Sequence, residues 1–257
     1  MPDRLIPSGA RLALTTFTIA PVRAGRVDRA TAAVAMALAP AVGALLGAVL
    51  AAILLAAAGA GAPALVGGAL TVTAGALLTR GLHLDGLADT VDALGSYRSG
   101  PAALEIMKKP DVGPFGVAAL VLVLLLQAGA LAALPDRRWP ALLATVVTAV
   151  AAGRLAVSWA CRRGVPAARP DGLGALVAGT VGPVPLTVAT LAVAGVAVAA
   201  VPGRPWQGPV VVGVALVAGL VLLRHTVRRL GGVTGDVLGA QVEVTTTLVY
   251  LGLVLTG

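Results

Sequence analysis

Long apolar runs without a charged side chain limit what this chain can fold into. Residues 31–58 contain no Asp, Glu, Lys or Arg, and several further runs approach or exceed the roughly 18 to 20 residues that cross a bilayer as a helix. Mean hydropathy is +0.96, and only 12% of the residues are charged. The chain is therefore expected to be an all-α, polytopic helical integral membrane protein.

About seven transmembrane helices can be placed on the chain, after an N-terminal helix that lies on the membrane surface or re-enters it. The N-terminal helix is expected within residues 11–22, where arginines follow a short apolar stretch in place of a cleavage site. The spans are expected at residues 31–58, 61–79, 115–134, 140–160, 174–200, 209–223 and 244–257. Gly182, Pro183 and Pro185 predict a kink or break in the fifth span. The last two spans are short and are expected to borrow length from their flanks.

The positively charged residues sort to one side of this layout. With the N-terminus in the cytoplasm, fifteen Lys and Arg fall inside, and only Arg137, Arg138 and Arg204 fall outside. Arg154 lies within a span. This bias also explains the net charge of +8 without a nucleic-acid partner, because the basic residues form no tract interleaved with aromatics.

The acidic residues also gather on one side, although the positive-inside rule does not govern them. On the cytoplasmic side the layout places Asp85, Asp89, Asp92, Glu105, Asp111, Asp171, Asp236 and Glu243. Only Asp136 falls outside in this comparison. A polar site that faces the cytoplasm would account for this distribution, and the loop at about residues 80–114 carries most of it.

Residues 80–95, RGLHLDGLADTVDALG, place Asp85, Asp89 and Asp92 on one stripe of a helix. Neighbouring like charges destabilise a helix unless a cation lies among them, and oxygen ligands suit Mg²⁺ or Mn²⁺. Mg²⁺ usually takes one or two carboxylates together with substrate phosphates. The stripe therefore predicts part of a phosphate and metal site; the alternative is a solvated acidic face. His83 points away from the stripe and could be a general base, a phosphate donor or a cap.

A second stretch, EIMKKPDVGPFG, combines Lys108 and Lys109 with a turn rich in proline and glycine. Ammonium groups and free backbone amides suit a pyrophosphate, because lysine binds phosphate as a point charge. The alternative is that the lysines only anchor the following span in the membrane.

A third stretch, RRLGGVTGDVLGA, is a glycine-rich turn that opens a helix and carries Thr234, Gly235 and Asp236. Such turns can bind phosphate, and Asp236 is a candidate further metal ligand. The single cysteine, Cys161, excludes an intramolecular disulfide and is interpreted as a packing residue.

Together the three motifs resemble the cobalamin synthase family, the adenosylcobinamide-GDP ribazoletransferases. The likeness extends over most of the chain, and TTFTIAPV is similar to the family's TRLPV-type opening. The resemblance implies one membrane-embedded catalytic domain, residues 1–257, in the bacterial cytoplasmic (inner) membrane, with its active site and N-terminus on the cytoplasmic side. It implies a Mg²⁺-dependent transfer in which the 5′-hydroxyl side of α-ribazole, or its 5′-phosphate form, displaces GMP from adenosylcobinamide-GDP and yields adenosylcobalamin or its phosphate.

The resemblance and the motifs assign roles to individual residues. The catalytic residues are expected to be Asp85, Asp89 and His83. Substrate binding is expected from Lys108, Lys109, Arg80, Thr234 and Gly235, and metal binding from Asp85, Asp89, Asp92 and Asp236. Two features depart from the family pattern: Lys109, Pro110 and Asp111 replace its DSR, and Ala93 stands where glycine is common.

Two other functions are alternatives to this assignment. CDP-alcohol phosphatidyltransferases have DGxxAR, but here Asp89 occupies the place of that arginine. A cation-coupled transporter would carry acids near the middle of its spans. Besides the two small-molecule substrates, the expected partners are membrane lipid and a second copy of the chain.

Overall fold

A computed structural model describes residues 5–23 and 25–255, and every element within them is a helix. The helices are α1 (Leu5–Phe17), α2 (Arg29–Gly59), α3 (Ala64–Leu78), α4 (Leu82–Gly95), α5 (Pro101–Ile106), α6 (Pro114–Ala132), α7 (Trp139–Ala160), α8 (Gly172–Val177), α9 (Pro183–Ala197), α10 (Gln207–Leu230) and α11 (Gly235–Val254). The predicted all-α class is confirmed. Arg4, one of the fifteen cations expected on the cytoplasmic side, and residues 256–257 of the last predicted span lie outside the described residues.

Five of these helices, α2, α6, α7, α10 and α11, are long and apolar enough to cross a membrane. Helices α3 and α4 pass the same test only as one element bent by 90°, and α9 has 15 residues. The chain is therefore an integral membrane protein with five or six helices of full spanning length. Each of the seven predicted spans coincides with a helix, but two of those helices are shorter than a straight crossing needs.

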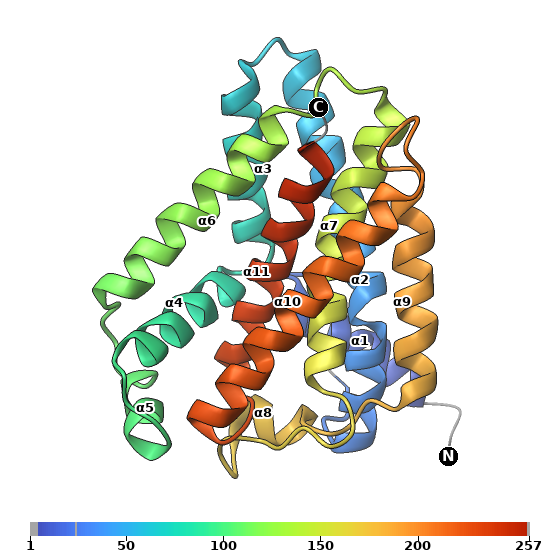
Figure 1. Ribbon diagram of the computed structural model, residues 1–257. Helices are drawn as coiled ribbons and strands as arrows, with labels where there is room; N and C mark the ends of the chain where they lie inside the picture. Colours follow the sequence, from blue (N-terminus) through green and yellow to red (C-terminus); the bar gives the residue numbers. More distant parts are fainter. Residues whose placement is uncertain (1–4, 24, 256–257) are drawn as a thin grey trace.

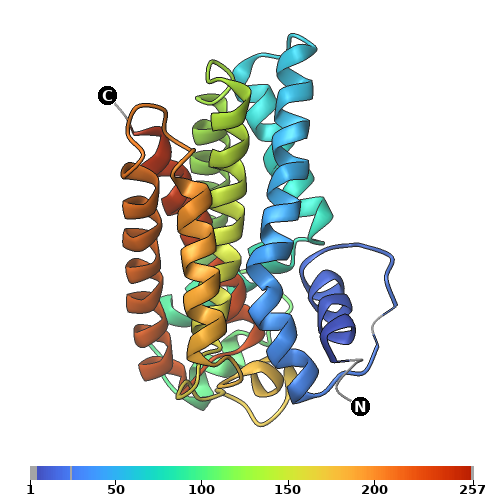
Figure 2. The same cartoon turned by 90° about the vertical axis from the view of Figure 1, so that its right-hand side faces the viewer.

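Helix α7 forms the centre of the bundle and packs against α2, α9, α10 and α11 (Figure 1). Most of its 22 residues are buried, in contrast to α6, whose face away from the bundle is exposed. Helix α1 lies beside the lower half of α2, outside the bundle, and buries Ala13 and Phe17 (Figure 2). The separate N-terminal helix is confirmed, although it ends at Phe17 and not at residue 22.

The break predicted in the fifth span is confirmed. Helix α8 ends at Val177, and α9 begins with Pro183 in its first turn, where a missing backbone N–H costs no hydrogen bond. The last two spans also gain length as expected, since α10 continues to Leu230 and α11 begins at Gly235. The third motif therefore lies across the short connection between these two helices.

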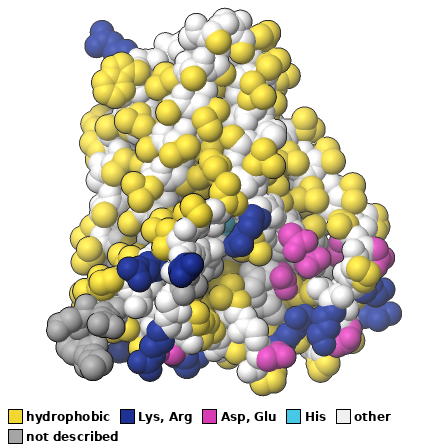
Figure 3. Space-filling model, turned by 180° about the vertical axis from the view of Figure 1, so that it is seen from behind, with side chains coloured by type: hydrophobic (Ala, Val, Ile, Leu, Met, Phe, Trp, Pro, Cys, Tyr) yellow, Lys and Arg dark blue, Asp and Glu magenta, His cyan; other side chains and the backbone are white. Residues whose placement is uncertain are grey.

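The two ends of the bundle differ in charge. The connections α2–α3, α6–α7 and α9–α10 lie at one end, and α5 and α8 lie at the other (Figure 1). Seen from behind, most Lys, Arg, Asp and Glu side chains gather on the half that carries α5 and α8 (Figure 3). This distribution agrees with the alternation of sides assumed for the spans.

The expectation that Glu243 lies on the cytoplasmic side is wrong. The residue lies near the middle of α11, where its Oε2 accepts a hydrogen bond of 2.9 Å from Nε2 of Gln127 on α6. The longer α11 draws Glu243 into the bundle, close enough to the buried Arg154 of α7 for electrostatic interaction. An acidic residue in the middle of a spanning helix therefore does not distinguish a transporter from an enzyme for this chain.

Candidate active site

The site forms where α4 crosses α11, and a glycine allows the close approach. A Cβ on Gly86 would lie 2.7 Å from the carbonyl oxygen of Asp236 and 2.9 Å from its Cα, so only glycine fits. On the other helix, a Cβ on Gly239 would lie 3.1 Å from the carbonyl oxygen of His83. The first and third motifs are thus in direct backbone contact, with Asp236 beside α4.

The carboxylates at this crossing repel one another. Helix α4 runs at 90° to α3, outside the straight spanning segments, and Asp89 lies midway along it. Burial raises the pKa of Asp89 to about 6, and the negative charges of Asp85, Asp236 and Asp92 add to the rise, whereas Arg169 opposes it. The neighbouring carboxylates therefore create a negative electrostatic potential at Asp89, and a cation bound among these side chains would offset it.

The carboxylate oxygens at the crossing fit a Mg²⁺ ion whose remaining ligands come from the substrate and from water. Within residues 5–23 and 25–255, no three Asp, Glu, His or Cys side chains are already gathered as a complete ligand set. Carboxylate oxygens are nevertheless the protein ligands that Mg²⁺ prefers, and one or two of them suffice when phosphates and waters complete the octahedron. The crossing therefore fits a shared protein and substrate site, and not a closed structural metal site.

Asp92 has a structural partner that the sequence did not reveal. Its Oδ2 accepts a hydrogen bond of 2.7 Å from the backbone N–H of Gly113, and its Oδ1 accepts one of 2.8 Å from that of Gly116. Asp92 thereby caps the start of α6 from across the fold. The expectation of free backbone amides in this turn is wrong for these two groups, because the carboxylate binds both. A Cβ on Gly116 would overlap Asp92, which explains the second glycine of GPFG.

Replacing Asp92 by alanine is expected to destabilise the protein by about 1–2 kcal/mol, because two N–H groups at the start of α6 lose their acceptor. Thermal unfolding in detergent would measure the change. Asp111→Ala is the matched control, since Asp111 is exposed and precedes the same turn. Equal unfolding temperatures for the two variants would show that the cap contributes nothing.

Thr234 and Asp236 shape the start of α11. The Thr234 hydroxyl accepts a hydrogen bond of 3.2 Å from the backbone N–H of Val237 and donates one of 3.2 Å to Oδ2 of Asp236. Thr234 is thus the N-cap of α11, and Gly235 is its first residue. These contacts fix the position of the Asp236 carboxylate at the crossing.

Arg169 is the site residue that reasoning from sequence missed. The segment before it pairs with the third motif: Val233 donates its backbone N–H to the Pro166 carbonyl at 2.9 Å, and Ala168 donates to the Val233 carbonyl at 3.0 Å. This pairing brings Arg169 next to Thr234 and within electrostatic range of Asp89. In the sequence Arg169 looked like one more cytoplasmic cation, and no motif around it signalled a site.

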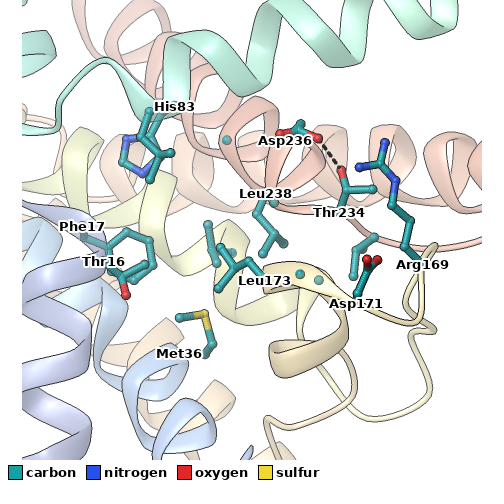
Figure 4. Close-up of a pocket in the computed structure, with 17 residues that line it drawn as sticks. Thr16, Phe17, Met36, His83, Arg169, Asp171, Leu173, Thr234, Asp236 and Leu238 are labelled. Atoms are coloured by element: carbon teal, nitrogen blue, oxygen red, sulfur yellow. Dashed lines mark hydrogen bonds between the residues drawn. The ribbon is translucent and has the colours of Figure 1, made fainter. Parts of the chain in front are cut away.

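Two cavities flank the crossing. The inner cavity has a volume of about 290 Å³ and includes His83, Phe17, Arg169, Thr234 and Asp236 in its lining (Figure 4). The outer cavity has a volume of about 400 Å³, and its charged lining residues are Asp89, Asp92, Arg98, Lys109 and Asp111. Gly235 also lines the inner cavity. Most of the site residues predicted from sequence therefore border one of the two cavities.

Three predicted site residues line neither cavity. The exposed Asp85 lies beside the crossing, where its charge acts on Asp89. Lys108 pairs with Glu105 at 2.8 Å in exposed positions. Arg80 donates a hydrogen bond of 3.1 Å to the Thr15 carbonyl and so ties α1 to the turn before α4.

The predicted direction of His83 is confirmed. The side chain is 4% exposed and stacks on Phe17, with ring centroids 6.0 Å apart and an interplanar angle of 19°, whereas Asp85 is exposed. Arg154 approaches its Nδ1 to 3.5 Å, and its Nε2 has no hydrogen-bond partner among the described residues. The imidazole thus belongs to the inner cavity and not to the aspartate stripe.

Comparison with known proteins places these features in one family. Residues 9–254 match the family model described as cobalamin-5-phosphate synthase. A protein of Frankia casuarinae named adenosylcobinamide-GDP ribazoletransferase is 42% identical over 96% of this chain and 94% of its own length. Proteins of the same name from Nocardioides sp. and Corynebacterium efficiens are 45% and 38% identical, over 91% and 95% of this chain and 92% and 90% of their own. No solved structure matches the chain.

Proposed function

This chain belongs to the cobalamin-5-phosphate synthase family and is a transferase of cobalamin synthesis, and we propose that it transfers adenosylcobinamide phosphate from adenosylcobinamide-GDP to α-ribazole or its 5′-phosphate, releasing GMP. The observation that carries the proposal is the family match over residues 9–254, together with the contact of the first and third motifs at the charged crossing of α4 and α11.

The transfer breaks the phosphoanhydride bond of the pyrophosphate and forms a phosphate ester bond to the acceptor. A ribose hydroxyl of the acceptor attacks the phosphorus on the cobinamide side, the bond from that phosphorus to the GMP oxygen breaks, and the hydroxyl proton passes to a base. When the acceptor already carries a 5′-phosphate, as the family name suggests for the product, its 5′-oxygen is occupied. In that case the attacking group is another free ribose hydroxyl and not the 5′-hydroxyl expected from the sequence.

The carboxylates at the crossing are proposed to hold Mg²⁺ and to accept the proton. Asp85, Asp89 and Asp236 would be the ligands, and the bound ion would neutralise charge that develops on the pyrophosphate. Asp89 borders the outer cavity and interacts electrostatically with Asp236 on the inner one, so it lies between the two. This position suits it to receive the proton of the attacking hydroxyl. Asp92 would support these three ligands indirectly, because it caps the start of α6.

The cations around the crossing are proposed to bind the phosphates. Lys109 and Arg98 on the outer cavity would face the pyrophosphate of adenosylcobinamide-GDP, and Arg169 would offset negative charge on the inner side. Lys109 replaces an acidic residue of the family pattern, and Asp111 on the same cavity supplies a carboxylate two positions later. The charged end of the bundle is proposed to face the cytoplasm of a bacterial cell, where these charged substrates are soluble.

The purified protein in lipid nanodiscs is expected to release GMP from adenosylcobinamide-GDP only when both Mg²⁺ and α-ribazole, or its 5′-phosphate, are present. Removing the metal with a chelator should lower the rate by at least 10²-fold, and added Mg²⁺ should restore it, because the charges at the crossing repel a pyrophosphate without a cation. GMP release followed by chromatography measures the rate. Equal release without any acceptor would identify a hydrolase, and no release under any condition would contradict the proposed function.

A further inference from the structure

Within the proposed function, on which this inference rests, we propose that the inner cavity is the binding site of the acceptor and holds the benzimidazole ring of α-ribazole against His83. The outer cavity and the carboxylates then face the phosphate donor. Four observations support the assignment: the two-ended lining of the cavity, its size, the stack of His83 on Phe17 and the hydrogen bonding of His83.

The inner cavity has one end of apolar and aromatic character and one charged end. His83, Phe17 and Met36 lie at one end, and Asp236, Arg169 and Asp171 at the other, with two leucines between them (Figure 4). A nucleoside with an apolar base has the same two-part character. The dimethylbenzimidazole ring of α-ribazole matches the first end, and its ribose with or without a 5′-phosphate matches the second.

The size of the cavity separates the two substrates. Its volume of about 290 Å³ is at the lower limit of small-molecule pockets, which suits a nucleoside. A corrin ring with its nucleotide tail is several times larger and does not fit. Acceptor binding in the inner cavity therefore leaves adenosylcobinamide-GDP to approach from the open, outer side of α4.

The contact with Arg154 points to one tautomer of His83. A guanidinium group has only donors, so the contact of 3.5 Å between Arg154 Nη2 and His83 Nδ1 is a hydrogen bond only when Nδ1 accepts. The proton of the neutral ring then lies on Nε2, a buried donor without a partner among the described residues. Such a group is costly unless a ligand satisfies it. Arg154 is thus a positioning residue, and His83 is a donor instead of a general base.

The benzimidazole ring of α-ribazole offers a hydrogen-bond acceptor for Nε2–H of His83. One nitrogen of the benzimidazole carries the ribose, and the other has an in-plane lone pair. A hydrogen bond from Nε2–H of His83 to this lone pair holds the base edge-on at the apolar end, beside the ring of Phe17. The ribose then points toward Thr234 and Asp236, next to the carboxylates proposed to receive its proton.

Kinetics of cavity variants test the location. Leu173 lines the cavity and is only partly buried, so Leu173→Trp should raise the KM for α-ribazole by about tenfold or more while the KM for adenosylcobinamide-GDP changes less than twofold. Leu191→Trp is the control, because Leu191 on α9 is 67% exposed and is not one of the residues that line the cavity. A rise in both KM values, or in neither, would overturn the assignment.

His83→Phe tests the hydrogen bond and keeps an aromatic ring beside Phe17. It should raise the KM for α-ribazole by about 5–10-fold, the loss of one hydrogen bond. Its matched control is His225→Phe, which alters the only other histidine, an exposed residue of α10. An unchanged KM for α-ribazole in His83→Phe would show that Nε2 does not bind the base.

Nitrogen NMR of ¹⁵N-histidine protein tests the tautomer without any assay of activity. In a His225→Gln background only His83 reports, and it should show protonated Nε2 and unprotonated Nδ1 at mildly alkaline pH. Adding α-ribazole alone should shift the Nε2 resonance. The opposite tautomer, or no shift on saturation with α-ribazole, would exclude the proposed donor role. If GMP release is normal while these tests fail, only the acceptor site is wrong; if wild-type protein releases no GMP, the proposed function is wrong.

Discussion

Asp89→Asn is expected to lower GMP release by about 10²–10³-fold while the protein still folds and inserts. Asparagine has the shape of aspartate, but it cannot hold a divalent cation as a charged ligand or take the proton of a hydroxyl group. Asp89 is the carboxylate on which the charges of Asp85, Asp92 and Asp236 converge, so its loss removes the centre of the proposed metal site. The rate of GMP release at saturating Mg²⁺ and both substrates is the measurement.

Asp136→Asn provides the matched control for this variant. It removes the same charge from an exposed residue of the α6–α7 connection, at the end of the bundle opposite to α5 and α8. The control should retain full activity. Because relief of repulsion favours folding, Asp89→Asn should unfold at the same or a higher temperature than the wild type. Wild-type rates in Asp89→Asn would contradict both of its proposed roles.

Gly86→Ala is expected to reduce activity by about 10²-fold through geometry alone. Its new methyl group would lie 2.7 Å from the Asp236 carbonyl oxygen, against backbone that cannot rotate away, so α4 and α11 must separate. The added distance moves Asp89 away from Asp236, and a displacement of about 1 Å in a reacting constellation costs roughly this factor. Activity and the Mg²⁺ concentration for half-maximal activity are to be measured together, and the latter should rise.

Gly129→Ala and Gly213→Ala are the controls for the same change. Both glycines lie inside helices, α6 and α10, and a Cβ at either position meets no atom within 4 Å. They should keep normal activity, and their helices should gain slightly in stability because alanine favours the helix. A normal rate in Gly86→Ala would mean that the close crossing of α4 and α11 is not needed for catalysis.

The fold could be predicted largely from local information. Uncharged runs long enough to cross a bilayer identify helices one at a time, and each helix satisfies its own backbone hydrogen bonds. The break before Pro183 follows from the missing proline N–H in the same way. The position of Glu243 was predicted wrongly because local information is not enough there. A single acidic residue next to an apolar run does not show whether another helix supplies a buried partner such as Gln127.

The site could be predicted only in part. Spacing placed the three aspartates of α4 on one stripe, but it could not show that Asp92 caps α6 while Asp89 faces Asp236. Arg169 was missed because its position depends on pairing between segments about 65 residues apart in the chain. Lys108 pairs with Glu105, about one helical turn away, a contact that the motif did not reveal, and its role in substrate binding stays a prediction.

The sequence by itself determined the membrane character, the helical class and the family, because apolar run length, charge placement and the motifs are all properties of contiguous residues. Only the tertiary structure decided which motif residues meet, which carboxylate is a cap and which direction His83 faces. Those outcomes depend on contacts between α4, α6, α7 and α11, at sites such as Gly86 where two backbones touch. RGLHLDGLADTVDALG therefore supplies the charges, while its partners in the other helices decide what each charge does.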